Sequence, residues 1–190
     1  MANKVKYGLK NVHFAIGTPT ESGGFTYATP VRIPGAVNLS LEAQGESSPF
    51  YADDGTYFIG NSNSGYQGDL EVAKFPLAFR TGVLGEAEDS NGVVYEDADA
   101  PVVHFALLFE FDGDEAATRY VMYNCTATRP SVASTTKTDT TEVQTETSTI
   151  TAKSTFISAL EKYVPKAYAE RTQTPYSTWY ESVYLPIASE

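Results

Sequence analysis

The sequence predicts a mainly β protein, an antiparallel β-sandwich or barrel with one short flanking α-helix. Three observations support this fold class. Two apolar runs in the middle of the chain are joined by an Asp-Gly turn, residues 37–44 and 66–74 alternate between apolar and polar side chains, and residues 76–84 carry a short helical signal. We expect one domain over residues 1–152, followed by a C-terminal arm over residues 153–190.

The N-terminal part predicts strands of unequal length. Residues 5–16 are apolar at nearly every second position, which indicates an early strand or an extended arm. Residues 17–24 are rich in Gly, Ser and Thr and predict a flexible loop. Residues 26–33 are short and interrupted by proline, so they form an edge strand at best.

Residues 37–44 and 66–74 predict two half-buried strands that pair with each other. Their alternation places apolar residues on one face and acidic residues on the other, wet face. The residues expected to face the core are Leu39, Leu41, Leu70 and Val72. The acidic residues expected on the wet face are Glu42, Asp69 and Glu71. A register slip by one residue would exchange the two sets.

The connection between these strands, residues 45–65, is a long inter-strand loop of about twenty residues, a length that is usually functional. It contains the large hydrophobic residues Phe50, Tyr51, Tyr57, Phe58 and Ile59. One interpretation is a second small hairpin on its own core, and the favoured one is a projecting arm that packs on another chain. Because ordering each residue costs about 1–2 kcal/mol, we expect the segment to become ordered only on assembly.

A short helix is predicted over residues 76–84, with Pro76 in its first turn and Gly85 as its stop. It is expected to cover one face of the sheet. Residues 86–99 are acidic and contain an Asn91-Gly92 turn, which indicates a small surface excursion.

The strongest hairpin signal joins an apolar run over residues 102–111 to a second one over residues 120–125. Asp112-Gly113-Asp114 supplies the turn residues between them. This hairpin is expected to be the centre of the core.

Two further elements are predicted near the C-terminus. Residues 142–152 predict a last long, Thr-rich strand with Glu142 and Glu146 on one polar side. Thr174-Pro175 resembles the cap and first position of a short helix that continues to Val183.

The amino-acid composition limits the classes of function that the protein can have. The chain has 190 residues, a net charge of −11 and 42% hydrophobic residues, so it can form a real core. The acidic excess lies within residues 1–152 and argues against ordinary nucleic-acid binding, which needs clustered Lys and Arg. The lone Cys125 lies in an apolar strand, where a buried, inert thiol is expected. We expect a soluble protein made in a reducing cytoplasm, without membrane contact.

No sequence pattern indicates catalysis, a metal site or a cofactor. His13 and His104 lie within apolar alternation, and a structural role is favoured for both. The carboxylate clusters lack the spacing of a twelve-residue calcium loop and are interpreted as a solvated acidic surface. A glycosidase-like carboxylate pair is not excluded, because any acidic chain offers candidates.

Several blocks resemble the major tail proteins, or tail tube proteins, of the phi13-like group of long-tailed bacteriophages infecting Gram-positive hosts. The blocks, in chain order, are residues 5–13, 33–37, 49–53, 104–113, 123–130 and 179–186. They span nearly the whole chain, and residues 156–174 match least well. The resemblance implies a tail-tube fold without cofactor or catalysis.

The same resemblance implies a structural virion protein that forms stacked, hexameric rings. The tube would hold a tape measure protein, meet a tail terminator and baseplate or distal tail proteins, and let DNA pass without specific binding. The lumen-facing candidates are Glu42, Asp69, Glu71, Glu142 and Glu146. The candidates for contacts between rings are Phe50, Tyr51, Tyr57, Phe58 and Ile59. Acidic lumen residues would repel DNA and keep it from adhering.

Two other functions fit parts of the sequence. A carbohydrate-binding β-sandwich is favoured by the abundant Tyr residues and Trp179. A hydrolase with an acidic pair is favoured only by the abundance of carboxylates.

Overall fold

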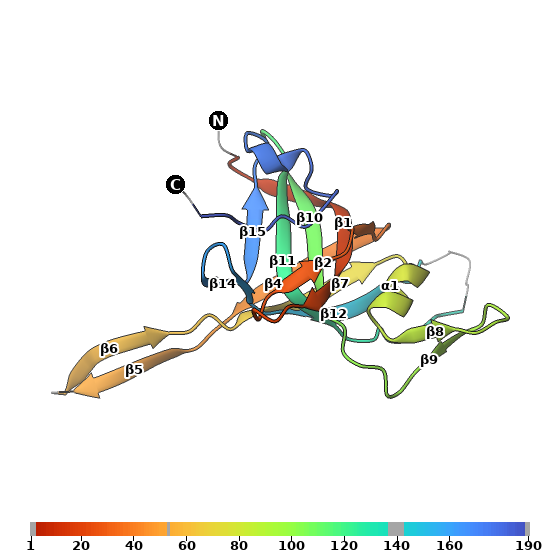
Figure 1. Cartoon of the computed structure of the whole chain (residues 1–190), viewed down its shortest axis with the longest axis horizontal. Helices are drawn as coiled ribbons and strands as arrows, with labels where there is room; N and C mark the ends of the chain where they lie inside the picture. The colour runs from red at the N-terminus through yellow and green to blue at the C-terminus, as the bar shows by residue number, and fades with distance from the viewer. Residues whose placement is uncertain (1–2, 53, 137–142, 189–190) are drawn as a thin grey trace.

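The computed structural model describes residues 3–188 except 53 and 137–142, and it confirms a mainly β, antiparallel fold (Figure 1). The first half contains β1 (Lys6–Pro19), β2 (Phe25–Tyr27), β3 (Val31–Arg32), β4 (Ala36–Gln44), β5 (Ser47–Ala52), β6 (Gly55–Asn61), β7 (Gly65–Val72) and α1 (Leu77–Gly82). The second half contains β8 (Glu86–Glu88), β9 (Val94–Glu96), β10 (Phe105–Gly113), β11 (Thr118–Ala127), β12 (Glu146–Ala152), β13 (Thr155–Ile157), β14 (Lys162–Val164), β15 (Lys166–Ala169) and the 3-10 helix η1 (Thr174–Tyr176).

In the described part of the chain, one nine-stranded sheet forms the body, with the order β2-β1-β10-β11-β12-β7-β4. β3 adds to β1, and β15 adds to β11. The strand β11 changes partner along its length, because residues 119–122 pair with β15 and residues 125–127 pair with β12. The sheet therefore consists of a β1-β10-β11 part and a β12-β7-β4 part, and it is not closed into a barrel.

The hairpin of β10 and β11 is at the centre, as predicted, with Phe109 opposite Tyr120 and Glu110 opposite Arg119. Residues Phe105 to Glu110 of β10 are all buried. Alternate side chains enter two different hydrophobic cores, which explains why the run is almost entirely apolar. The first core includes Phe14, Leu70, Phe79, Phe105, Leu107 and Ile150. The second includes Ala15, Ala106, Leu108, Val121, Tyr123 and Trp179.

The predicted helix is confirmed as α1, which Pro76 caps at its N-terminus. Its side chain Phe79 is fully buried and meets Phe14 edge-on, at 5.1 Å between ring centroids. Phe75 stacks on Phe79 at 4.8 Å. The helix thus closes the first core from one side, which is the role expected for it.

The segment predicted as a long loop is instead a β-hairpin. Its strands β5 and β6 pair over Ser47–Asn61, and Asp54 adopts a left-handed backbone with φ 61° beside Gly55. Asp tolerates this conformation because its short side chain can bond locally. Figure 1 shows the hairpin extending away from the body of the protein, as the projecting-arm interpretation expected.

The predicted helix from Thr174 to Val183 is wrong, because only the 3-10 helix η1 and turns occupy this stretch. Tertiary packing overrides the local signal here. Trp179 is 1% exposed in the second core, and its Nε1 donates a hydrogen bond to the Tyr120 carbonyl at 3.2 Å. Residues 153–188 thus supply β15 to the main sheet and cover its second face.

Candidate functional site, a polar sheet face beside an open edge

Three neighbouring strands, β4, β7 and β12, present three rows of polar side chains on their outer face. Their register places Ser40 opposite Asp69, and Asp69 opposite Thr149. Two further rows across the same strands are Asn38, Glu71 and Thr147, and Glu42, Gln67 and Thr151. We call these nine residues the polar face. The sheet thereby collects side chains from positions more than 100 residues apart in the chain.

Threonine hydroxyls hold two of the carboxylates of the polar face. Thr149 Oγ1 donates to Asp69 Oδ1 at 2.8 Å, and Thr145 Oγ1 donates to Glu71 Oε1 at 2.6 Å. No Lys or Arg occurs in β4, β7 or β12. The polar face therefore has a negative potential that no base on these strands offsets.

The opposite side of β4 and β7 faces the first core. Leu70 and Val72 are fully buried, and Leu39 and Leu41 are half-buried against the same core. The predicted alternation of these two strands is therefore correct. Gly68 lies between Leu41 and Ile150 in the register, where a Cβ atom would stand 1.8 Å from the Ser40 carbonyl oxygen. Only glycine allows the strands to approach so closely.

The polar face ends at an open sheet edge. Among the described residues, β4 pairs with β7 and with no strand on its other side. An unpaired edge exposes backbone donors and acceptors that another chain can pair with. The β5–β6 hairpin follows β4 directly in the chain and extends away from the body beyond one end of this edge strand (Figure 1).

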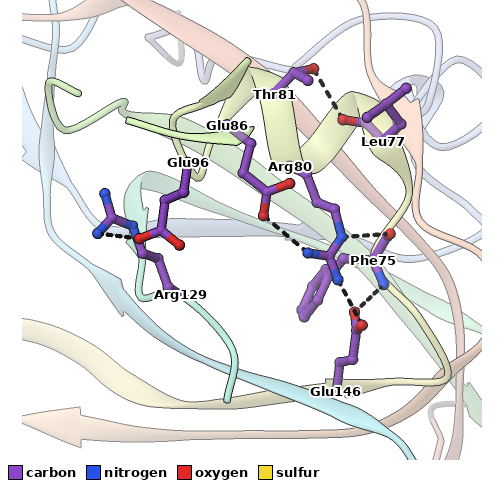
Figure 2. Close-up of polar contacts among 8 residues, drawn as sticks. All are labelled: Phe75, Leu77, Arg80, Thr81, Glu86, Glu96, Arg129 and Glu146. Carbon is purple, nitrogen blue, oxygen red and sulfur yellow. Dashed lines mark hydrogen bonds and ion pairs between the residues drawn. The ribbon is translucent and has the colours of Figure 1, made fainter. Parts of the chain in front are cut away.

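Glu146 is separated from the other acidic candidates. Opposite Val72 in the register, it lies on the inner side of the sheet, where its carboxylate accepts hydrogen bonds from Arg80 at 2.6 Å and from the Phe75 backbone at 2.8 Å (Figure 2). Arg80 also bridges to Glu86 at 3.0 Å. Grouping Glu146 with Asp69 on one face was therefore wrong, because threonines occupy the outer positions of β12. Glu142 lies outside the described residues.

Of the five hairpin residues expected to contact other rings, the structure describes the side chain of one. The side chain of Phe58 is 65% exposed. The side chains of Phe50, Tyr51, Tyr57 and Ile59 lie outside the described residues.

His13, His104 and Cys125 each contact neighbouring groups within the fold. Burial lowers the pKa of His13, whose ring stacks on Tyr180 at 4.4 Å. His104 Nδ1 lies 2.7 Å from Asn124 Oδ1. Burial raises the pKa of the Cys125 thiol to about 12, in accord with the inert thiol predicted. In the described residues, no cluster of three potential metal ligands and no helix long and apolar enough to cross a membrane occurs.

One polar cluster was missed by the sequence reasoning. Glu110 is only 6% exposed and accepts hydrogen bonds from Asn11 at 2.9 Å, from Arg119 Nε at 3.1 Å and from Tyr180 at 3.3 Å. The guanidinium of Arg119 also lies 3.9 Å from the ring centroid of Tyr176. A weak signal was available, because Glu110 and Arg119 lie on opposite sides of the predicted turn, but only the register of the structure pairs them. The cluster joins the C-terminal segment to the central hairpin.

Comparison with known proteins gives limited information. No family model and no curated protein matches the chain. A solved structure described as the "Cryo-EM structure of the anti-feeding prophage cap (AFP tube terminating cap)" is 12% identical, with 89% of this chain and 94% of that chain covered and a TM-score of 0.39. A similarity of this degree does not define a shared fold.

Proposed function

We propose that this chain is the tail tube subunit of a long-tailed bacteriophage, a structural protein that assembles into stacked hexameric rings. The observation that carries the proposal is the combination of the polar face with the open edge of β4. Neighbouring copies that pair at this edge would continue the sheet, and closure into a ring would remove the exposed edge. The sequence resemblance supports the same role.

In such a ring, the polar face would line the lumen. Glu42, Asp69 and Glu71 would then present negative charge to DNA moving through the tube, with no base on β4, β7 or β12 to hold it. Glu146 has no part in this surface, because it bonds to Arg80 on the inner side of the sheet. The role requires neither a cofactor nor a catalytic centre.

The β5–β6 hairpin would provide contacts between rings. Its exposed Phe58 would gain about 1.5–3 kcal/mol on full burial against a neighbour. The tube would enclose a tape measure protein and end at a terminator and at baseplate proteins. The site of action would be the virion.

The carbohydrate-binding alternative loses one of its two arguments. Trp179 is 1% exposed and fills the second core, so it cannot stack on a sugar. The exposed tyrosines that remain, such as Tyr163 at 70% and Tyr168 at 56%, come from β14 and β15.

Electron microscopy of the purified chain at high concentration tests the proposal, with sedimentation for the mass. We expect rings or tubes with a central hole. A protein that remains monomeric at millimolar concentration and shows no rings would contradict it.

A paired variant tests the hairpin. Replacing Phe50 and Phe58 with Ser should leave a folded subunit that no longer forms tubes. Hydrogen exchange of residues 45–65 should slow when the unmodified chain assembles. Normal tubes from the double variant would contradict this role for the hairpin.

A further inference from the structure

The β8–β9 hairpin is a second projecting hairpin, separate from both the polar face and the β5–β6 hairpin. It lies at the far end of the molecule from β5–β6, and both extend from the body (Figure 1). Residues 86–99 contain the acids Glu86, Glu88, Asp89, Glu96, Asp97 and Asp99 and no base. They also expose Val93 by 59%, Val94 by 39% and Tyr95 by 53%. An acidic hairpin with exposed apolar side chains is suited to a basic, apolar partner.

Internal contacts give this hairpin a defined shape. Asp89 Oδ1 accepts hydrogen bonds from the backbone of Asn91 and of Val93, both at 2.8 Å. At the base of the hairpin, Glu86 bonds to Arg80 at 3.0 Å, and Glu96 bonds to Arg129 at 2.6 Å (Figure 2). Such a braced hairpin loses little conformational entropy on binding.

A surface of the opposite character lies between β4 and the β10–β11 hairpin. A hollow of about 360 Å³ there is lined by residues that include Leu41, Tyr66, Phe111, Tyr120, Lys6 and Lys166. A second hollow, of about 350 Å³, shares Lys6, Phe111 and Tyr120 with it and adds Lys4 and Tyr168. We call the two together the basic trough.

The charges of the basic trough are positioned by its aromatic rings. The Lys6 ammonium lies 5.4 Å from the ring centroid of Phe111, and that of Lys166 lies 4.6 Å from that of Tyr66. Among the described residues that line the two hollows, Glu170 is the only acid. In a chain with a net charge of −11, three lysines around an aromatic floor form a local exception.

We propose that the β8–β9 hairpin of one copy docks in the basic trough of a second copy. Tyr95 and Val94 would contact the aromatic floor, and Glu88 and Asp99 would face the lysines. Because the two surfaces differ, the contact is heterologous, so it can repeat from copy to copy and close into a ring. This contact rests on the self-assembly proposed above and names the surfaces that meet.

Charge reversal tests the contact. The double variant Lys6→Glu, Lys166→Glu should weaken self-association at least about tenfold in sedimentation experiments, because it places like charges together. Lys162→Glu, which reverses an exposed lysine on β14, is the matched control and should have little effect. Mixing the trough variant with a Glu88→Lys, Asp99→Lys variant should restore association.

Cross-linking tests the geometry directly. Single variants Val94→Cys and Lys6→Cys should form a disulfide-linked heterodimer when mixed and oxidised, while each variant alone should form much less. The native Cys125 is buried and should not compete. Absence of the heterodimer, or equal dimers from each variant alone, would overturn the contact.

The two proposals can fail separately. If the trough variant still forms rings by microscopy and no heterodimer is found, the contact is wrong and the ring role stands. If the unmodified chain forms neither rings nor the heterodimer, both are wrong.

Discussion

Strands β10 and β7 both belong to the main sheet, but they differ in the number of faces that the protein covers. In β10, Leu107 enters the first core and Leu108 the second, and both are fully buried. In β7, Leu70 is fully buried, whereas its neighbour Asp69 is exposed. The comparison teaches that β10 stabilises the protein from both faces, while β7 does so from one face and leaves its other face exposed to solvent.

The largest effect is expected from truncation in β10. Leu107→Ala should lower the free energy of unfolding by about 2–5 kcal/mol, since it removes buried methyl groups and leaves a cavity. Leu108→Ala should cost a similar amount in the second core. On β7, Gln67→Ala should change stability by less than about 0.5 kcal/mol. Urea denaturation measures all three, and equal losses for Leu107 and Gln67 would contradict the comparison.

The ion pairs of Arg80 on the inner side of β12, β7 and β4 should contribute measurably to stability. Arg80→Met should cost about 1–3 kcal/mol, because Glu146 keeps only the Phe75 backbone as a partner. The matched control is Arg129→Met, whose pair with Glu96 has side chains 45% and 54% exposed and should contribute about 0–1 kcal/mol. The side chains of Arg80 and Glu146 are only 23% and 24% exposed. Urea denaturation measures both losses. A larger loss of unfolding free energy for Arg129→Met than for Arg80→Met would show that burial does not decide how much an ion pair contributes.

A pH effect is expected in the doubly covered region. The thiol of Cys125 titrates near pH 8.5 in an unfolded chain, while burial raises its pKa to about 12 in the folded protein. The unfolded state therefore releases a proton first as pH rises. Stability should fall by up to about 1.4 kcal/mol per pH unit between these values, and it should be independent of this group below pH 8.

The variant Cys125→Ala isolates this effect. It should reduce the slope of stability against pH between pH 9 and 10, whatever it changes at pH 7. Burial also raises the pKa of Tyr123 and of Tyr180, so a slope should remain above pH 10 in the variant. Identical slopes for the two proteins from pH 9 to 10 would contradict the prediction.

The same comparison explains what could be predicted from the sequence. Both β10 and β7 could be predicted. In residues 102–111, β-branched and aromatic residues without a helical period favour a strand, and residues 66–74 alternate cleanly between apolar and polar side chains. The polar face was predicted in β4 and β7 but not in β12, where threonines alternate with few apolar residues and do not distinguish the faces. This ambiguity placed Glu146 on the wrong side. The open edge and the C-terminal turns depend on tertiary packing, which local patterns do not encode.

Only a small change in stability is expected on the polar face itself, from Asp69→Lys combined with Glu71→Lys. Both positions face outward, so the free energy of unfolding should change by only about 0.5 kcal/mol per site. The potential of the face, however, changes sign. If the face lines a tube, the assembled variant should retain short DNA fragments at low salt and release them as salt rises, since phosphate contacts weaken with ionic strength. The neutral variant Asp69→Asn, Glu71→Gln is the control and should retain less. Sedimentation of labelled DNA with the tubes measures retention, and equal retention by the charge-reversed and unmodified tubes would place this face away from the DNA path.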